Sequence, residues 1–167
     1  MARAKSCSPA TFRFSPLAVR SDGWLVAGGL DQASHPQLLA TDGGAPVQVW
    51  TDPGMIPFGV QVGPAGELYL VGRNGTGIQR SADGVTFASA DDGLDGGATQ
   101  VYGLAFPGGG GVLAATQAGV WLAPPGGTFS ELGGFSAEPS VWSVAVAPGA
   151  NVAVATTNQG VYRRQLP

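Results

Sequence analysis

Three short runs of the sequence share one pattern and decide the fold. They read Phe58-Gly-Val-Gln-Val62, Tyr102-Gly-Leu-Ala-Phe106 and Trp142-Ser-Val-Ala-Val146. Each run begins with an aromatic residue, continues with a small one and places apolar residues at its third and fifth positions. The runs start 44 and then 40 residues apart, and Leu17-Ala-Val19 matches their ends 43 residues before Val60. Self-similarity at this period is typical of a repeat architecture.

Further sets of runs repeat with similar offsets, so that a repeat contains four strands. The runs are rich in Val, Leu and aromatic residues and are bounded by Gly, Pro, Asn and Asp, which is the composition of strands and turns. No stretch shows a 3.6-residue period with caps, and we expect almost no helix. The second strands are expected at 24–28, 68–72, 112–116 and 152–156, the third at 37–41, 77–81, 119–123 and 160–164, and the fourth at 47–50, 85–88 and 127–130.

Four strands in a repeat of about 40–45 residues form the blade of a β-propeller. We therefore predict an all-β, β-propeller-like chain of about four four-stranded antiparallel blades. Residues 1–9 are expected to form a flexible segment and 10–167 a single domain, with repeats at about 12–54, 56–97, 99–139 and 140–167. The last repeat ends after its third strand, which leaves two interpretations open. Either Ala10–Arg13 supplies the missing outer strand, or Phe12–Val19 is one inner strand of an incomplete ring or of a fragment of a larger propeller.

Composition and charge exclude several classes of function. Charged residues make up 11% of the 167 residues and the net charge is −3, so the chain lacks the basic footprint of a nucleic-acid-binding protein. No apolar run approaches the length of about 18 residues that membrane insertion needs, and no signal peptide is visible, which leaves the compartment open. Cys7 and His35 are the only residues of their types. An internal disulfide and a His/Cys zinc site are excluded, and we predict no metal or cofactor.

Residues Arg80-Ser-Ala-Asp-Gly-Val-Thr-Phe87 join the third and fourth strands of the second repeat. They resemble the Asp-box of bacterial-neuraminidase-type repeats, Ser-x-Asp-x-Gly-x-Thr-Trp, with one residue fewer and Phe in place of Trp. The resemblance implies a β-propeller of the kind found in sialidases, xyloglucanases, sortilin-type receptors and photosystem II assembly factors, which are often secreted or periplasmic. It also implies a structural role for the matching residues, because an Asp in such a turn accepts hydrogen bonds from backbone N–H groups. These residues are Ser81, Asp83, Gly84, Thr86 and Phe87, with Asp42 in a degenerate second copy.

The aromatic residues that begin the three inner-strand runs are the first candidates for ligand binding. Phe58, Tyr102 and Trp142 occupy equivalent positions, near the face of a propeller where ligands usually enter. Aromatic rings suit sugar faces and protein hot spots; the alternative is that they pack between blades. The second candidate is the long connection in the first repeat, which carries Asp31 and His35. An irregular loop on a regular scaffold is a common place for specificity, although a plain surface insertion is the alternative.

The candidate residues favour binding over catalysis. Glycoside hydrolysis needs two carboxyl groups about 5–9.5 Å apart, and the inner-strand runs contain none. We expect a non-catalytic binding or scaffold module that presents a loop face to a protein or glycan partner. The alternative is a fragment of a larger secreted Asp-box propeller enzyme, such as a xyloglucanase- or sialidase-like glycoside hydrolase. A third possibility is a homodimer that completes an eight-bladed ring, because exposed sheet edges favour pairing.

Overall fold

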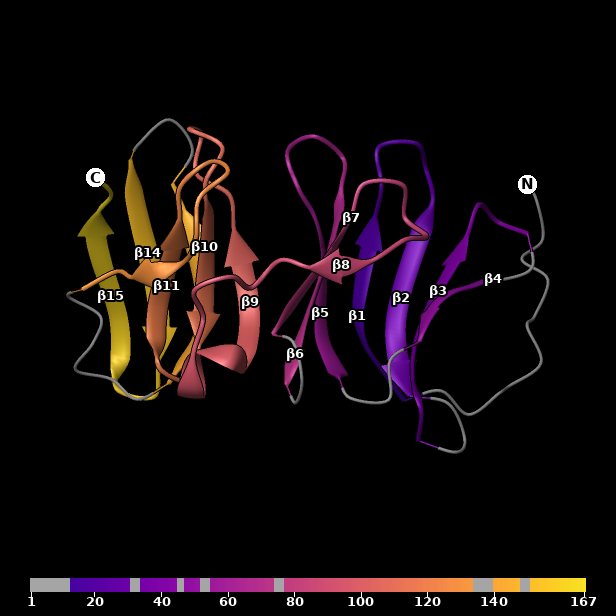
Figure 1. Cartoon of the computed structure of the whole chain (residues 1–167), viewed down its shortest axis with the longest axis horizontal. Helices are drawn as coiled ribbons and strands as arrows, with labels where there is room; N and C mark the ends of the chain where they lie inside the picture. The colour runs from indigo at the N-terminus through magenta and orange to yellow at the C-terminus, as the bar shows by residue number, and fades with distance from the viewer. Residues whose placement is uncertain are drawn as a thin grey trace.

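The computed structural model describes residues 13–30, 34–44, 47–51, 55–73, 77–133, 140–147 and 151–167. In these ranges the chain is all-β apart from one short 3-10 helix, η1 (Gly96–Thr99), and none of its helices has the length and apolarity to span a bilayer. The strands form four antiparallel sheets in which sequence neighbours pair in order. Figure 1 shows these sheets side by side along the long axis of the molecule, with β13–β15 at one end and β1–β4 at the other.

Each sheet is one blade. The blades are numbered 1 to 4 in chain order, and the first strand of each blade is its inner strand. Blades 1, 2 and 3 have four strands each, and blade 4 has three within the described residues. Blade 1 contains β1 (Arg13–Val19), β2 (Leu25–Leu30), β3 (Pro36–Thr41) and β4 (Val47–Thr51); blade 2 contains β5 (Ile56–Val62), β6 (Leu68–Arg73), β7 (Ile78–Ser81) and β8 (Ala88–Ser89); blade 3 contains β9 (Val101–Ala105), β10 (Val112–Thr116), β11 (Gly119–Ala123) and β12 (Ser130–Glu131); and blade 4 contains β13 (Val141–Val146), β14 (Val152–Thr157) and β15 (Gly160–Gln165).

The core lies between blades rather than inside any one of them. Side chains alternate between the two faces of a strand, so that a middle blade buries one set of residues against the preceding blade and the other set against the following one. In β6, for example, Leu70 packs in the cluster shared with blade 1, whereas Val71 packs in the cluster shared with blade 3. A third cluster, which includes Leu113 and Val144, joins blades 3 and 4. Each fully buried side chain of this size contributes about 1.5–3 kcal/mol.

The four blades form an open arc, which confirms the predicted all-β, β-propeller-like fold. The inner strands of successive blades pack together, β1 with β5, β5 with β9 and β9 with β13, and the described residues show no comparable packing between blade 4 and blade 1. Arg13 pairs with Leu30 in blade 1 and so begins an inner strand. This position contradicts the interpretation that places Arg13 in the outer strand of blade 4; residues 10–12 lie outside the described ranges.

Candidate functional site

A β-bulge interrupts the inner strand of blades 2, 3 and 4 at the same place. The pairing register shifts between Pro57 and Gly59 in β5, and the corresponding shifts in β9 and β13 also pass over one residue. A bulge inserts an unpaired residue and redirects its side chain, which is why bulges are common beside functional sites. The residues passed over are the three predicted aromatic ones, Phe58, Tyr102 and Trp142.

The bulges bring these three aromatic side chains into one continuous stack across blades 2, 3 and 4. The ring centroids of Phe58 and Tyr102 lie 5.6 Å apart with an interplanar angle of 28°. Those of Tyr102 and Trp142 lie 5.0 Å apart at 42°. Such pairs contribute about 0.5–1.5 kcal/mol beyond their buried area. Tyr102 therefore has a neighbour on both sides, while Trp142, at the end of the stack, remains 53% exposed.

The aromatic stack lines a shallow hollow on the concave side of the arc. The hollow has a volume of about 360 Å³ and is bounded by residues from all four inner strands. Leu17 of β1, itself 67% exposed, lies at the blade 1 side, and Trp142 and Ser143 of β13 lie at the blade 4 side. Gly103 also lines the hollow, and a Cβ added to it would meet no atom within 4 Å apart from its two neighbours in the chain. The surface beside the stack is therefore open to an incoming group.

A glutamine fixes the spacing of the inner strands beneath this surface. The Gln61 side-chain amide donates from Nε2 to the backbone O of Leu104 at 2.9 Å. Its Oε1 accepts from the backbone N–H of Leu104 at 2.6 Å. Strand β9 is the inner edge of its sheet, and Gln61 satisfies the two backbone groups that point away from β10. We did not predict this role. The sequence does contain a signal for it, because Gln61 is a long polar residue at the position where the two matching inner-strand runs carry Ala105 and Ala145.

The predicted Asp-box residues of blade 2 form a tight, self-bonded turn. Asp83 Oδ1 accepts hydrogen bonds from the Ser81 hydroxyl at 2.9 Å, from Val85 N at 2.8 Å and from Thr86 N at 2.7 Å. Hydrogen bonds from the Thr86 and Val85 backbone, and then from Ser81, hold the pKa of Asp83 well below its usual range. The Ser81 hydroxyl in turn accepts from Gly84 N, and Gly84 adopts a φ of +81°. These contacts give the side chains a structural task, whereas membership of the Asp-box repeat type stays a prediction.

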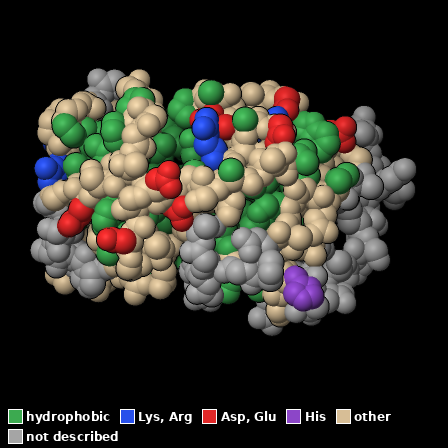
Figure 2. Space-filling model, in the orientation of Figure 1, with side chains coloured by type: hydrophobic (Ala, Val, Ile, Leu, Met, Phe, Trp, Pro, Cys, Tyr) green, Lys and Arg blue, Asp and Glu red, His purple; other side chains and the backbone are tan. Residues whose placement is uncertain are grey.

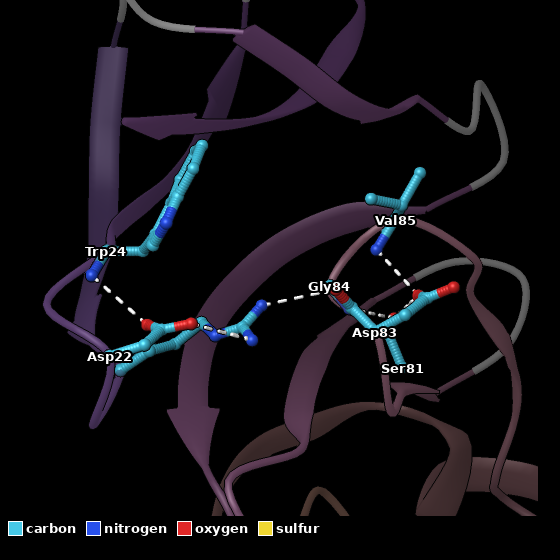
Figure 3. Close-up of polar contacts among 7 residues, drawn as sticks. Asp22, Trp24, Ser81, Asp83, Gly84 and Val85 are labelled. Carbon is cyan, nitrogen blue, oxygen red and sulfur yellow. Dashed lines mark hydrogen bonds and ion pairs between the residues drawn. The ribbon is translucent and has the colours of Figure 1, made fainter. Parts of the chain in front are cut away.

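This turn also joins blade 2 to blade 1 (Figure 3). The guanidinium of Arg20 donates to the backbone O of Asp83 at 3.3 Å and forms an ion pair with Asp22 at 3.0 Å. On the same interface, the rings of Phe87 and Trp50 meet edge to face with centroids 6.3 Å apart. Phe87 therefore packs between sheets. Asp42, in the corresponding turn of blade 1, accepts from Gly44 N at 3.1 Å.

Of the two loop candidates in the first repeat, the structure describes only His35, and it does not line the hollow. His35 is exposed just before β3, and it is not among the residues that line the concave surface. Asp31 lies outside the described residues. On the face shown in Figure 2, acidic side chains are spread among hydrophobic and small ones, and basic side chains occur only in isolated places. Nothing in the described residues assembles His35 into a cluster of potential metal ligands.

A second, larger groove runs between blades 2 and 3 and was not predicted. It has a volume of about 590 Å³, and its lining includes Glu67, Tyr69 and Arg80. Glu67 is only 8% exposed; it accepts from Ala65 N at 2.9 Å and from the Tyr69 hydroxyl at 3.3 Å. Arg80 lies 3.6 Å from Glu67 and stacks over the Tyr69 ring. Burial, the largest influence, raises the pKa of Tyr69. Because the Glu67 carboxylate already has three partners, its evident task is to hold the β5–β6 turn.

Comparison with known proteins supports the propeller fold from structure alone. No protein-family model matches the sequence, and no curated protein matches it. The solved structures that match include virginiamycin B lyase from Staphylococcus aureus, in its inactive H270A form with quinupristin, with a TM-score of 0.70 and 10% identity over 99% of this chain and 59% of the lyase. A gluconolactonase from Xanthomonas campestris matches with a TM-score of 0.67 and 17% identity over 90% of this chain and 56% of the enzyme.

A further match is PorZ, a surface component of the type-IX secretion system of Porphyromonas gingivalis, with a TM-score of 0.70 and 12% identity over 91% of this chain and 26% of PorZ. The chain spans somewhat more than half the length of the lyase and the gluconolactonase. At these identities the likeness concerns the fold and not the chemistry. The chain is a β-propeller-like arc of four blades.

Proposed function

We propose that the chain is a non-catalytic binding module whose ligand surface is the concave hollow beside the aromatic stack. The observation that carries this proposal is the placement of Phe58, Tyr102 and Trp142 at equivalent bulges of three successive inner strands. A stack used only for packing would cover its terminal ring, yet Trp142 is 53% exposed. Exposed tryptophans are typical anchors of binding interfaces.

The spacing of the rings favours a protein partner over a carbohydrate chain. A row of sugars needs several separate, open ring faces, whereas Phe58, Tyr102 and Trp142 lie only 5.0–5.6 Å apart and cover one another. Trp142 is the most exposed of the three rings and can receive a new group on its outer side. One apolar or aromatic side chain, with the adjacent segment of its own chain, fits this arrangement and the shallow hollow around it.

The chemistry of the hollow also favours binding. Among the described residues that line it, Tyr102 is the only one with an ionisable side chain, and the others are apolar, Gly, Ser or Gln. Acid–base hydrolysis relies on paired titratable groups positioned at the reacting bond. The hollow offers apolar area, ring faces and hydrogen-bonding groups instead, which are the components of a recognition surface.

Selection from a displayed library of random peptides tests this function. The purified 167-residue chain serves as bait, with a Trp142→Ala variant for counter-selection. We expect enriched peptides that carry an aromatic or large aliphatic anchor, and we expect the variant to bind them at least about 30-fold more weakly, as a hot-spot residue requires. A Gly103→Leu variant, which adds a large side chain to the lining of the hollow, should weaken binding as well.

The matched control is Val85→Ala, which shortens a side chain that is 63% exposed in the blade 2 turn and should leave peptide binding unchanged. A glycan array screened in parallel separates the two partner classes. If no peptide is enriched and the chain binds a glycan that the Trp142→Ala variant does not bind, the partner is a sugar and not a protein. No binding to either library, or binding that both hollow variants retain, would refute the proposed site.

One observation favours a second candidate function. The chain spans only 56–60% of the gluconolactonase and lyase structures that it resembles, so its four blades correspond to part of a larger enzyme ring. In that case, the four blades would supply one wall of a site whose reacting groups lie on other blades. Expression of the longest open reading frame that contains these residues, followed by assays for lactone and glycoside hydrolysis, tests this candidate.

A further inference from the structure

Blade 1 carries a bare apolar face at one end of the arc. Leu17 and Val19 on β1 are 67% and 60% exposed, and Leu25 on β2 is 42% exposed. Val19 pairs with Leu25 across the two strands, and Leu17 lies two residues before Val19, so that all three side chains lie on one face of the sheet. Their neighbour Val26 lies on the opposite face and is 1% exposed against blade 2.

The same face is covered in every other blade. In blade 2 its residues include Val60, 5% exposed, and Leu68, 1% exposed, which pack against blade 1. In blades 3 and 4 the positions that match Leu17 are Leu104, 3% exposed, and Val144, 7% exposed. In each of these three blades the face is covered by the opposite face of the preceding blade. The apolar face of blade 1 therefore has the chemistry of an interface whose partner is another blade.

Within the described residues, the outer face of blade 4 is exposed along β15, at Val161, Arg163 and Gln165, whereas Val152 on the same face is 7% exposed. In blade 4, pairing places Val154 with Arg163 and Thr156 with Val161 on the side away from blade 3. Val161 is 72% exposed there, and it corresponds to Val120 of blade 3, which is 1% exposed against blade 4. Figure 1 places blades 1 and 4 at opposite ends of the arc, with β1–β4 on one side and β13–β15 on the other.

We propose that two copies of this chain associate head to tail, with the outer face of blade 4 of each copy packed on the apolar face of blade 1 of the other. Both junctions repeat the blade-to-blade contact already made three times within one chain. A heterologous contact of this kind closes into a ring when the rotation permits, and here it gives eight blades. The ring places Trp142 of one copy beside the junction with Leu17 of the other, so that the binding hollow continues across the interface.

Sedimentation velocity of the 167-residue chain at micromolar concentration tests the association. We expect a discrete species with twice the 16.7 kDa mass of one chain. Leu17→Glu and, separately, Val161→Glu each place a charge in one of the two faces, and each variant alone should sediment as a monomer. Both side chains are largely exposed in the single chain, so both variants should keep the circular dichroism spectrum of the parent. Val85→Glu adds the same charge at an exposed turn and should remain dimeric.

Mixing the two monomeric variants distinguishes head-to-tail pairing from face-to-face pairing. The intact blade 4 face of Leu17→Glu can meet the intact blade 1 face of Val161→Glu, and the mixture should therefore regain a one-to-one complex. Pairing of two blade 1 faces would instead leave Val161→Glu dimeric and overturn the proposal. A parent chain that stays monomeric would also overturn the proposal. The blade 1 face would then be expected to pack against a blade of another polypeptide segment. The peptide-binding test at Trp142 uses a different readout, and either proposal can fail without the other.

Discussion

Replacement of Gln61 by leucine should destabilise the chain without changing its fold. The substitution keeps the size of the side chain but removes the two hydrogen bonds to Leu104, of 2.9 and 2.6 Å. Each such bond contributes about 0.5–1.5 kcal/mol, and an unsatisfied buried partner costs about 1–3 kcal/mol. Because Gln61 lines the open hollow, water can reach part of the vacated site. We therefore expect a loss of about 2 kcal/mol in the free energy of unfolding.

Urea unfolding followed by tryptophan fluorescence measures this loss. With a slope of about 2 kcal/mol per molar urea, the midpoint should fall by about 1 M while the slope stays constant. Parent and variant are compared at one protein concentration, so that any self-association contributes equally. A Gln61→Leu chain that unfolds within about 0.5 kcal/mol of the parent would refute the idea that Gln61 fastens blade 2 to blade 3, because that is the scatter of ordinary surface substitutions.

A Gln61→Glu variant provides an internal control for the geometry. At neutral pH the carboxylate can still accept from Leu104 N, but it faces the Leu104 carbonyl oxygen without a proton to donate. This repulsion raises the pKa of the new carboxyl in the folded chain, so protonation stabilises the folded state relative to the unfolded one. The stability gap between the variant and the parent should therefore narrow as pH falls below about 5 and widen as pH rises. A gap that is independent of pH would show that residue 61 does not face the carbonyl.

Three further outcomes follow from the junction between blades 1 and 2. Hydrogen bonds from Thr86, Val85 and Ser81 lower the pKa of Asp83. The ionised Asp83 side chain therefore stabilises the folded state above the ordinary carboxyl pKa, and this stabilisation is lost as pH falls. Thermal melts between about pH 2 and 6 should therefore converge at low pH for the parent and Asp83→Ala. Gly84→Ala should cost about 1 kcal/mol or more, measured by urea unfolding, since its φ is +81° and the new Cβ would collide with Arg20 Nη1. Phe87→Leu should lose about 1 kcal/mol because it removes the edge-to-face contact with Trp50, and the same loss in a Trp50→Leu background would contradict that cause.

The features that could be predicted from the sequence are those whose causes are local. Strands and turns recur because each depends on a few adjacent residues, and the inner-strand aromatics were found because they recur with the strands. The hydrogen bonds that the Asp83 carboxylate accepts span at most three residues along the chain. A turn of that kind is recognisable from residue types and spacing, which is why a structural task for Asp83 could be anticipated.

The features that the sequence did not reveal depend on partners in another blade. Gln61 bonds to a residue 43 positions later, and nothing in its own run identifies that partner. A register shift depends on how two strands align, so the pattern at Trp142 predicted an equivalent position but not a bulge. The same holds for Leu17, whose residue type matches that of its buried siblings. Its exposure follows only from its place at the end of the arc.

All three junctions between blades contain an apolar cluster, and the contacts added to that cluster differ from junction to junction. Blades 1 and 2 are also joined by Arg20 and by the Trp50–Phe87 contact. Between blades 2 and 3, the side chain of Gln61 bridges the two inner strands beneath the aromatic stack. A repeat array transmits stability only between neighbours. The bridge therefore stiffens the floor under Phe58 and Tyr102, while Trp142, one blade further out, lies on a blade with a single covered face. A partner that stacks on Trp142 would thus stabilise one of the two end blades of the arc, each of which packs against one neighbouring blade.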